Sequence, residues 1–159
     1  MKKLFFGISA ILLIAATAQA QHKIKAGTSY SYVSMERTTC FGTCPNYKIE
    51  ISSNGHIKYT GRAFAKPQGT YEKKVSKKII ASIFDEMRKY NIDTCSEMYP
   101  MKIADLPGII YYFKSGSTTK HIQNAQFGPV FLKEIADDMD SIGKPGKGWK
   151  KTASYKDPR

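Results

Sequence analysis

The sequence predicts an α+β domain, in which an antiparallel sheet built from hairpins packs two helices on one face. Three observations lead to this fold class. Apolar and polar residues alternate on both sides of Asn54-Gly55, a second pair of strand-like segments flanks Ser115-Gly116, and two later segments carry apolar residues at helical spacing. Because strands joined by hairpins pair antiparallel, the expected order of elements is β-ββ-β-α-ββ-α.

The first 20 residues have the features of a secretory signal peptide. Lys2 and Lys3 form a positive start, residues 4–16 form a short apolar run, and Ala18-Gln19-Ala20 matches an A-x-A cleavage site. We therefore expect cleavage after Ala20 and export to the periplasm or the extracellular space. No later stretch has about 20 apolar residues, so no membrane span is expected in the mature form.

A single domain is expected over residues 29–143, after a flexible polar leader at 21–28. The domain begins with a weak strand from Ser29 to Thr39, in which aromatic and β-branched residues recur. A tight turn follows at residues 40–45, where Gly and Pro interrupt the chain.

The hairpin over residues 46–62 has two competing registers. A two-residue loop at Asn54-Gly55 would divide the apolar side chains between the two faces of the sheet. A three-residue loop that also includes Ser53 places Ile51 opposite Ile57 and keeps the apolar side chains on one face. Because register follows the apolar face, we expect the three-residue loop, with Gly55 in the left-handed conformation of a bulged turn.

The remaining elements follow from turn signals and periodicity. Residues 69–75 are expected to form a short, exposed edge strand, and Ser76 is expected to cap a helix from about Lys77 to Tyr90. Residues 108–113 are apolar on both faces, which predicts a central strand. The closing elements are a return strand from Thr118 to Gln123 and a helix that begins near Pro129 and ends at Gly143.

The charge of the chain is concentrated in two segments. The 159 residues carry 25 Lys and Arg against 13 Asp and Glu, which gives a formal net charge of +12. A chain of this length is too short for an enzyme built as a β-barrel surrounded by helices. Residues 62–78 and residues 144–159 each contain six basic residues and one acidic residue. The second segment has no apolar period, so we expect a basic, disordered tail there.

The basic residues of the first segment are candidates for anion binding. They lie on the expected edge strand and at the start of the first helix, where positive charge is unfavourable unless an anion is present. Alternatively, lysines on an edge strand deter the addition of another strand. Export argues against nucleic acid, so the expected partners are an anionic envelope lipid or glycan, or another envelope protein. The candidates are Arg62, Lys73, Lys74, Lys77 and Lys78.

The three cysteines allow more than one arrangement. In an exported protein a disulfide is the expected state, and it can join Cys40 to Cys44 or either of them to Cys95. The C-x-x-x-C-P spacing also resembles the copper-binding motif of chaperones for cytochrome oxidase assembly, which would make His121 a third ligand. That family places the motif between a strand and a helix, whereas here it opens a hairpin. We therefore expect no metal and no cofactor.

The long connection over residues 91–108 is a second candidate site. Tyr99 and Asp105 could serve a hydrolase, with the Asp105 carboxylate as a base or a ligand. We favour a structural role, in which Asp105 caps backbone amides and Pro107 fixes the entry into the next strand. The sequence has no phosphate loop, dinucleotide-binding glycine pattern or nucleophile elbow. The acidic residues at 137, 138 and 140 are expected on a solvated helix face.

Two motifs of the chain are distinctive, the opening Cys40-Phe41-Gly42-Thr43-Cys44-Pro45-x-Tyr47 and the later Asp105-Leu106-Pro107. Together they resemble the motifs of a family of secreted bacterial domains of unknown function. The resemblance covers about residues 34–142. It implies a Cys40–Cys44 disulfide with Cys95 as a free thiol, and it supplies no mechanism. We therefore expect a non-catalytic binding or envelope-interaction module. The alternatives are a copper-binding or redox protein that uses the cysteine pair, and a hydrolase near Asp105.

Overall fold

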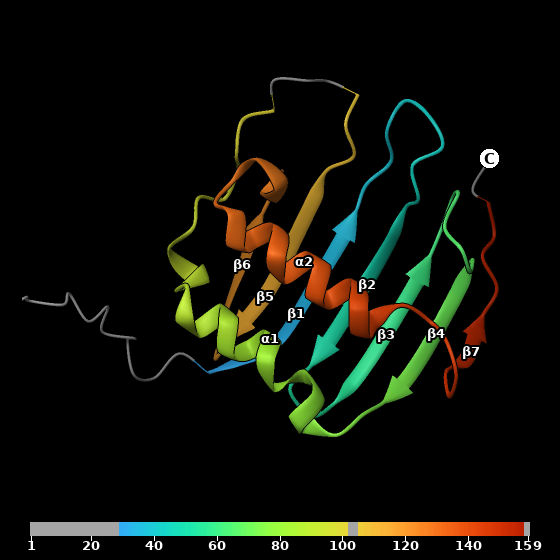
Figure 1. The fold of residues 1–159 in the computed structure, drawn as a ribbon, viewed down its shortest axis with the longest axis horizontal. Coiled ribbons are helices and arrows are strands. Elements are labelled where there is room, and N and C mark those ends of the chain that lie inside the picture. Colours follow the sequence, from blue (N-terminus) through green and yellow to red (C-terminus); the bar gives the residue numbers. More distant parts are fainter. Residues whose placement is uncertain (1–28, 102–104, 158–159) are drawn as a thin grey trace, which may run out of the picture.

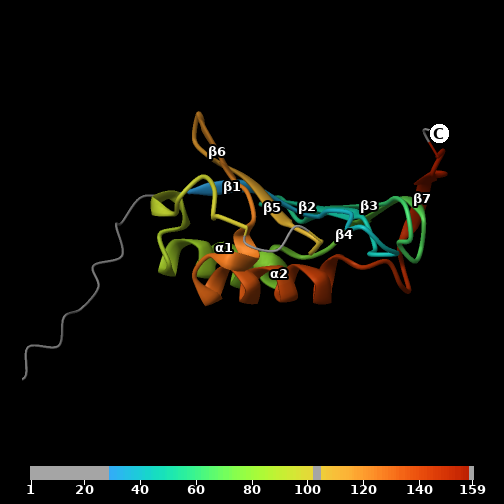
Figure 2. The same cartoon turned by 90° about the horizontal axis from the view of Figure 1, so that it is seen from above.

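The computed structural model describes residues 29–101 and 105–157. The expected signal peptide and leader, residues 1–28, lie outside the described residues. An antiparallel sheet forms one layer, and two helices lie along one of its faces (Figures 1 and 2). The expected α+β class and the antiparallel sheet are therefore confirmed.

Seven strands form the sheet, in the order β6-β5-β1-β2-β3-β4-β7. Every neighbouring pair is antiparallel. The strands are β1 (Tyr30–Arg37), β2 (Tyr47–Ser52), β3 (His56–Gly61), β4 (Gly69–Lys74), β5 (Ile109–Ser115), β6 (Thr118–Ile122) and β7 (Lys150–Ala153). The helices are α1 (Lys77–Lys89) and α2 (Val130–Gly143), with short 3₁₀ helices at Ile92–Thr94 and Ala125–Phe127.

The hairpin between β2 and β3 has the predicted three-residue loop. Ile51 pairs with Ile57 and Ile49 pairs with Tyr59, and all four side chains are buried. Gly55 adopts a φ of 93°, which favours glycine. A Cβ at this position would also collide with the carbonyl oxygen of Val75, so the turn requires glycine for two reasons.

The core lies between the sheet and the two helices. Figure 2 shows α1 and α2 on the same side of the sheet. Their buried side chains recur every three or four residues and meet the buried face of the strands. Ser76 stands at the start of α1 as predicted, but its side chain makes no capping hydrogen bond. The buried helix residues are Ile80, Ile83, Phe84 and Met87 of α1, and Leu132, Ile135, Ala136 and Met139 of α2.

The expectation of a disordered C-terminal tail is wrong for residues 150–153. These residues form β7, which pairs antiparallel with β4. As a result, β4 has a neighbour on each side and is not the edge strand that the sequence suggested. All four side chains of β7 are exposed, so the strand carries no apolar pattern by which it could be predicted.

The expectation that residues 108–113 form a central strand with apolar side chains on both faces is also wrong. β5 lies second from one edge, between β6 and β1. Its second face has no helix over it, so Ile110 is only half-buried and Tyr112 is exposed. The Tyr112 ring stacks on His121 of β6, with ring centroids 4.2 Å apart.

The strand directions bring three connections to one edge of the sheet. β1 and β3 end at this edge, and β2, β4 and β5 begin there, because neighbouring strands run in opposite directions. The connections at this edge are residues 38–46, residues 62–68 and the segment that precedes Ile109 (Figure 1). We refer to this side of the molecule as the loop edge.

Candidate functional site

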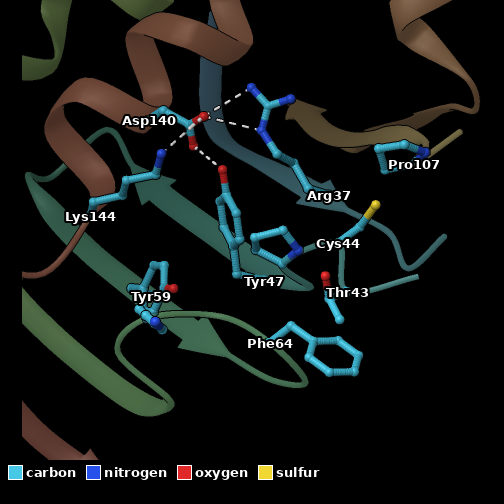
Figure 3. A pocket seen from close by; sticks show the side chains of 11 residues that line it. Arg37, Thr43, Cys44, Tyr47, Tyr59, Phe64, Pro107, Asp140 and Lys144 are labelled. Atoms are coloured by element: carbon cyan, nitrogen blue, oxygen red, sulfur yellow. Dashed lines mark hydrogen bonds and ion pairs between the residues drawn. The ribbon is translucent and has the colours of Figure 1, made fainter.

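A cleft of about 830 Å³ opens at the loop edge, where the C-terminal part of α2 approaches the sheet (Figure 3). Its walls are largely apolar, with Tyr47 and Tyr59 from the sheet and Phe64 from the β3–β4 connection. Pro45 and Pro107 complete these walls from the other two connections. The cleft therefore joins all three loop-edge connections to one helix.

A partly buried ion pair between Arg37 and Asp140 forms the floor of the cleft. Asp140 of α2 accepts hydrogen bonds from Arg37 Nε (3.1 Å) and Nη2 (2.9 Å) at its Oδ2 atom. Its Oδ1 atom accepts a hydrogen bond of 2.7 Å from the Tyr47 hydroxyl. Lys144 Nζ lies 3.5 Å from Asp140 Oδ2 and 5.5 Å from the centre of the Tyr47 ring. Both carboxylate oxygens are thus engaged by the protein itself (Figure 3).

These contacts keep the groups around the carboxylate in their protonated forms. Burial raises the pKa of Tyr47 well above its ordinary value, and the hydrogen bond to Asp140 raises it further. Burial and the nearby Asp140 charge raise the pKa of Tyr59 to about 12. Burial alone would lower the pKa of the Arg37 guanidinium, but the attraction of Asp140 raises it. At neutral pH the cleft therefore presents hydrogen-bond donors and cations.

Asp140 reaches the sheet because α2 ends very close to it. Gly143, one turn after Asp140, is buried against Ile49 of β2. A Cβ on Gly143 would lie within 2.8 Å of Ile49 Cδ1 and closer still to Cγ2. Glycine therefore permits the approach that places both Asp140 and Lys144 over the cleft.

Replacing Gly143 with alanine is expected to destabilise the domain by about 1–2 kcal/mol. Overpacking against the fully buried Ile49 outweighs the better helix propensity of alanine. The free energy of unfolding in urea measures the effect. The control is Gly146→Ala, since a Cβ on Gly146 meets no atom within 4 Å. Equal stability of the two variants would contradict the close approach.

Further contacts fix the loop-edge connections, within the β1–β2 connection and between it and the β3–β4 connection. Cys40 and Cys44 form a disulfide within the β1–β2 connection, with Cα atoms 5.6 Å apart. The Asn46 side chain donates a hydrogen bond of 2.7 Å to the Arg37 carbonyl, and its backbone bonds to residues of the β3–β4 connection. Arg62 Nη1 donates a hydrogen bond of 2.6 Å to Glu36 Oε1. These contacts therefore hold the β1–β2 and β3–β4 connections in place at the cleft.

The disulfide decides among the cysteine arrangements. Cys40 and Cys44 are the pair, and Cys95 is a buried free thiol. In this state neither sulfur of the pair is a thiolate, which is the form that binds Cu(I). His121 stacks on Tyr112, and its buried Nε2 atom has no hydrogen-bond partner among the described residues. Within residues 29–101 and 105–157, no group of three His, Cys, Asp or Glu side chains is arranged to hold a metal ion.

Asp105 does not cap backbone amides in the part of the chain that the structure describes. It is exposed, and it makes no hydrogen bond with a described residue. The Tyr99 ring packs closely against Gly128, and its backbone bonds to Gln123. Tyr99 is thus a packing residue, and the structure does not join it with Asp105 in a common cleft.

The five basic candidates do not form one site either. Arg62 is paired with Glu36, and Lys73 Nζ donates a hydrogen bond of 3.3 Å to the carbonyl of Lys147. Lys74, Lys77 and Lys78 are exposed around the junction of β4 and α1. Their position opposite the loop edge separates them from the cleft.

Sequence reasoning missed the residues of the cleft floor. No sequence pattern selects Arg37, and Tyr47 enters only as the last residue of the cysteine motif. Asp140 is expected on a solvated face, although its side chain is only 14% exposed. The single local signal is the spacing of Asp140 and Lys144, four residues apart in or next to a helix. The long-range contacts to β1 and β2 have no local signal.

The fold and the cleft define a small α+β domain whose open antiparallel sheet carries a cleft at the loop edge. No helix in the described part of the chain is long and apolar enough to cross a membrane. The chain belongs to the family described as a domain of unknown function (DUF6438), whose sequence profile matches residues 31–143. This confirms the expected membership in a family of domains of unknown function. No curated protein matches the chain.

Proposed function

We propose that this domain is a non-catalytic binding module of the bacterial envelope, and that its loop-edge cleft takes an anion attached to an apolar group. The supporting observation is the chemistry of the lining. Three cations, Arg37, Lys66 and Lys144, line the cleft with a single acidic residue, Asp140. The lining thus carries a net positive charge in an apolar surrounding, which strengthens the attraction of an anion.

Two of the three cations are not tightly paired within the protein and can contact a ligand. The Lys144 side chain is 53% exposed and lies at the long distance of 3.5 Å from Asp140. Lys66 is exposed on the β3–β4 connection, and no ion pair within the described residues involves it. Arg37, by contrast, is held by Asp140. Lys66 and Lys144 are therefore the groups that would contact the anion.

A binding role fits the polar groups of the cleft better than a catalytic role. A general base needs a free lone pair within reach of the substrate. Both oxygens of Asp140 already accept hydrogen bonds, and the Tyr47 hydroxyl donates one to that carboxylate. The aromatic rings of Tyr47, Tyr59 and Phe64 supply the apolar contact area.

The disulfide is compatible with a location of this module outside the cytoplasm. A disulfide is the form expected of a secreted or periplasmic protein, and the Cys40–Cys44 bond is present. We propose that cleavage after Ala20 releases the domain outside the cytoplasm. An anionic lipid, a glycan or another envelope protein would then supply the anion.

The exchange of Lys144 for glutamine is expected to weaken the binding of phenyl phosphate about fivefold, because a charged contact to the phosphate is lost. Phenyl phosphate combines the anion with an apolar ring, and its binding is followed by amide chemical shifts in β2 and β3. The matched control is Lys89→Gln. Lys89 Nζ lies over the Tyr90 ring at 4.6 Å, so the same charge and the same type of contact are removed from α1 instead.

The two variants separate the cleft from general charge effects. Lys89→Gln is expected to bind phenyl phosphate as the unmodified protein does. Equal weakening of both variants, or shifts that do not involve cleft residues such as Tyr59 and Phe64, would refute the proposed site.

A further inference from the structure

Three large apolar side chains project from the loop edge around the cleft. Phe41 is 94% exposed in the β1–β2 connection, and Phe64 is 51% exposed in the β3–β4 connection. Leu106, in the segment before β5, is 42% exposed. Phe64 itself lines the cleft, and so do Thr43, two residues after Phe41, and Pro107, directly after Leu106. The three projections therefore come from connections that border one opening.

The protein holds two of these side chains in their exposed positions. Phe41 lies inside the ring closed by the Cys40–Cys44 disulfide, and the Gly42 amide donates a hydrogen bond of 3.3 Å to Cys40 Sγ. Phe64 has a φ of 59°, a left-handed conformation that is strained for a bulky aromatic residue. Strain of this kind persists where the surrounding structure maintains it, and it is concentrated at functional sites.

Two lysines, Lys66 and Lys144, lie among the three projections and favour an anionic surface. Residues 38–46 and 62–68 contain no Asp or Glu, and Arg62 of the second segment is paired with Glu36. The third connection carries one exposed carboxylate, Asp105, next to Leu106. Aromatic side chains flanked by lysine are typical of protein segments that enter the headgroup region of a bilayer.

The area of the three projections favours a lipid surface over a protein partner. An aromatic side chain buries at most about 250 Å², and the exposed fractions of the three side chains are 94%, 51% and 42%, so together they offer at most about 470 Å². This is well short of the roughly 800 Å² that each partner contributes to a typical protein interface. They also protrude from separate connections and do not form a groove. Insertion into lipid needs no matching partner surface, because each side chain enters the apolar region independently.

We propose that the loop edge docks on anionic phospholipid, with Phe41, Phe64 and Leu106 inserted among the acyl chains and a headgroup phosphate in the cleft beside Lys66 and Lys144. This inference rests on the proposed function, because the phosphate occupies the same cleft. It adds a defined ligand source and an orientation of the domain on the membrane.

The test is sedimentation of the exported form, which begins at Gln21, with vesicles of phosphatidylcholine that contain about one third phosphatidylglycerol. We expect the protein to sediment with these vesicles and to stay in solution with pure phosphatidylcholine. Phe41→Ser is expected to reduce vesicle binding about tenfold, because its ring is the most exposed of the three. Ile79→Ser is the matched control, since Ile79 is 50% exposed at the start of α1, on the opposite edge of the sheet.

The phenyl phosphate titration separates failure of this inference from failure of the proposed function. Phe41 does not line the cleft, so Phe41→Ser is expected to bind phenyl phosphate normally while it loses vesicle binding. A protein that binds phenyl phosphate but neither type of vesicle would overturn the lipid inference alone. Equal vesicle binding by Phe41→Ser and Ile79→Ser would do the same. A protein that binds neither probe would overturn both proposals.

Discussion

Exchange of Asp140 for asparagine is expected to destabilise the domain by about 2–3 kcal/mol. The carboxylate accepts two hydrogen bonds from Arg37 and one from Tyr47. The neutral amide has one oxygen acceptor, so one donor loses its partner and the half-buried guanidinium loses its counter-charge. The loss of one partner of a buried pair costs several kcal/mol, and the 26% exposure of the Arg37 side chain reduces that cost.

The neighbouring Asp137 provides a matched control for this variant. Asp137 Oδ1 lies 3.3 Å from the same Arg37 Nη2 atom, but the Asp137 side chain is 61% exposed. An exposed ion pair contributes little to stability, so Asp137→Asn is expected to remain within about 0.5 kcal/mol of the unmodified protein. Urea unfolding of both variants at neutral pH measures the difference. Equal destabilisation by the two changes would show that Asp140 has no special role in the floor of the cleft.

The parts of the fold that the sequence predicts correctly depend on local patterns. The β2–β3 register follows from keeping Ile49, Ile51 and Ile57 on one face, and the structure has this register. Both helices follow from apolar residues at helical spacing, and α1 runs from Lys77 to Lys89, one residue shorter than expected. In each case the residues that form the pattern, and whose burial it predicts, lie within one segment of about 15 residues.

The floor of the cleft depends on contacts that no local pattern reports. Arg37 and Asp140 are 103 residues apart, and Tyr47 and Asp140 are 93 residues apart. Their meeting requires that α2 cross the buried face of the sheet and end over β2, where Gly143 allows close packing. A carboxylate on the polar side of an amphipathic helix is most often solvated. Asp140 is an exception, because the end of α2 lies close enough to the sheet for Arg37 of β1 and Tyr47 of β2 to reach its carboxylate.

β7 illustrates a different limit of sequence reasoning. Its sequence from Lys150 to Ala153 has no alternation, because none of its side chains is buried. The strand forms because β4 offers free backbone groups at its outer side, a property of the sheet and not of residues 150–153. As a consequence, the two basic segments of the chain lie side by side, with Lys150 paired opposite Glu72.

Four buried tyrosines are expected to make the domain unfold steeply in alkali. Burial raises the pKa of each of them above the ordinary value of about 10, to about 12 for Tyr59 and well above the ordinary value for the other three. The unfolded chain loses these protons from about pH 10, whereas the folded chain retains them. Their contribution to stability is therefore complete below pH 10 and is lost as the pH rises toward the folded values. The residues are Tyr30, Tyr47, Tyr59 and Tyr111.

These four groups are expected to contribute a loss of about 4 kcal/mol between pH 10 and pH 11, since each retained proton contributes about 1 kcal/mol over this interval. Tyr32, whose pKa is also raised to about 12, adds to this loss. Urea unfolding at pH 7, 10 and 11 measures the decline, and absorbance of tyrosinate reports when the hydroxyls ionise. Because the folded state protects these groups, the tyrosinate signal should rise together with unfolding and not before it.

The exchange of Tyr59 for phenylalanine tests this linkage at a single group. The Tyr59 hydroxyl makes no hydrogen bond with a described residue, so its removal is expected to change stability at pH 7 by less than about 1 kcal/mol. The loss between pH 10 and pH 11 should nevertheless shrink by about 1 kcal/mol, because one retained proton is gone. Tyr90→Phe, whose ring lies stacked on Phe131 outside the core, should leave that loss unchanged. An equal change in both variants would show that alkaline unfolding has another origin, such as the titration of surface lysines.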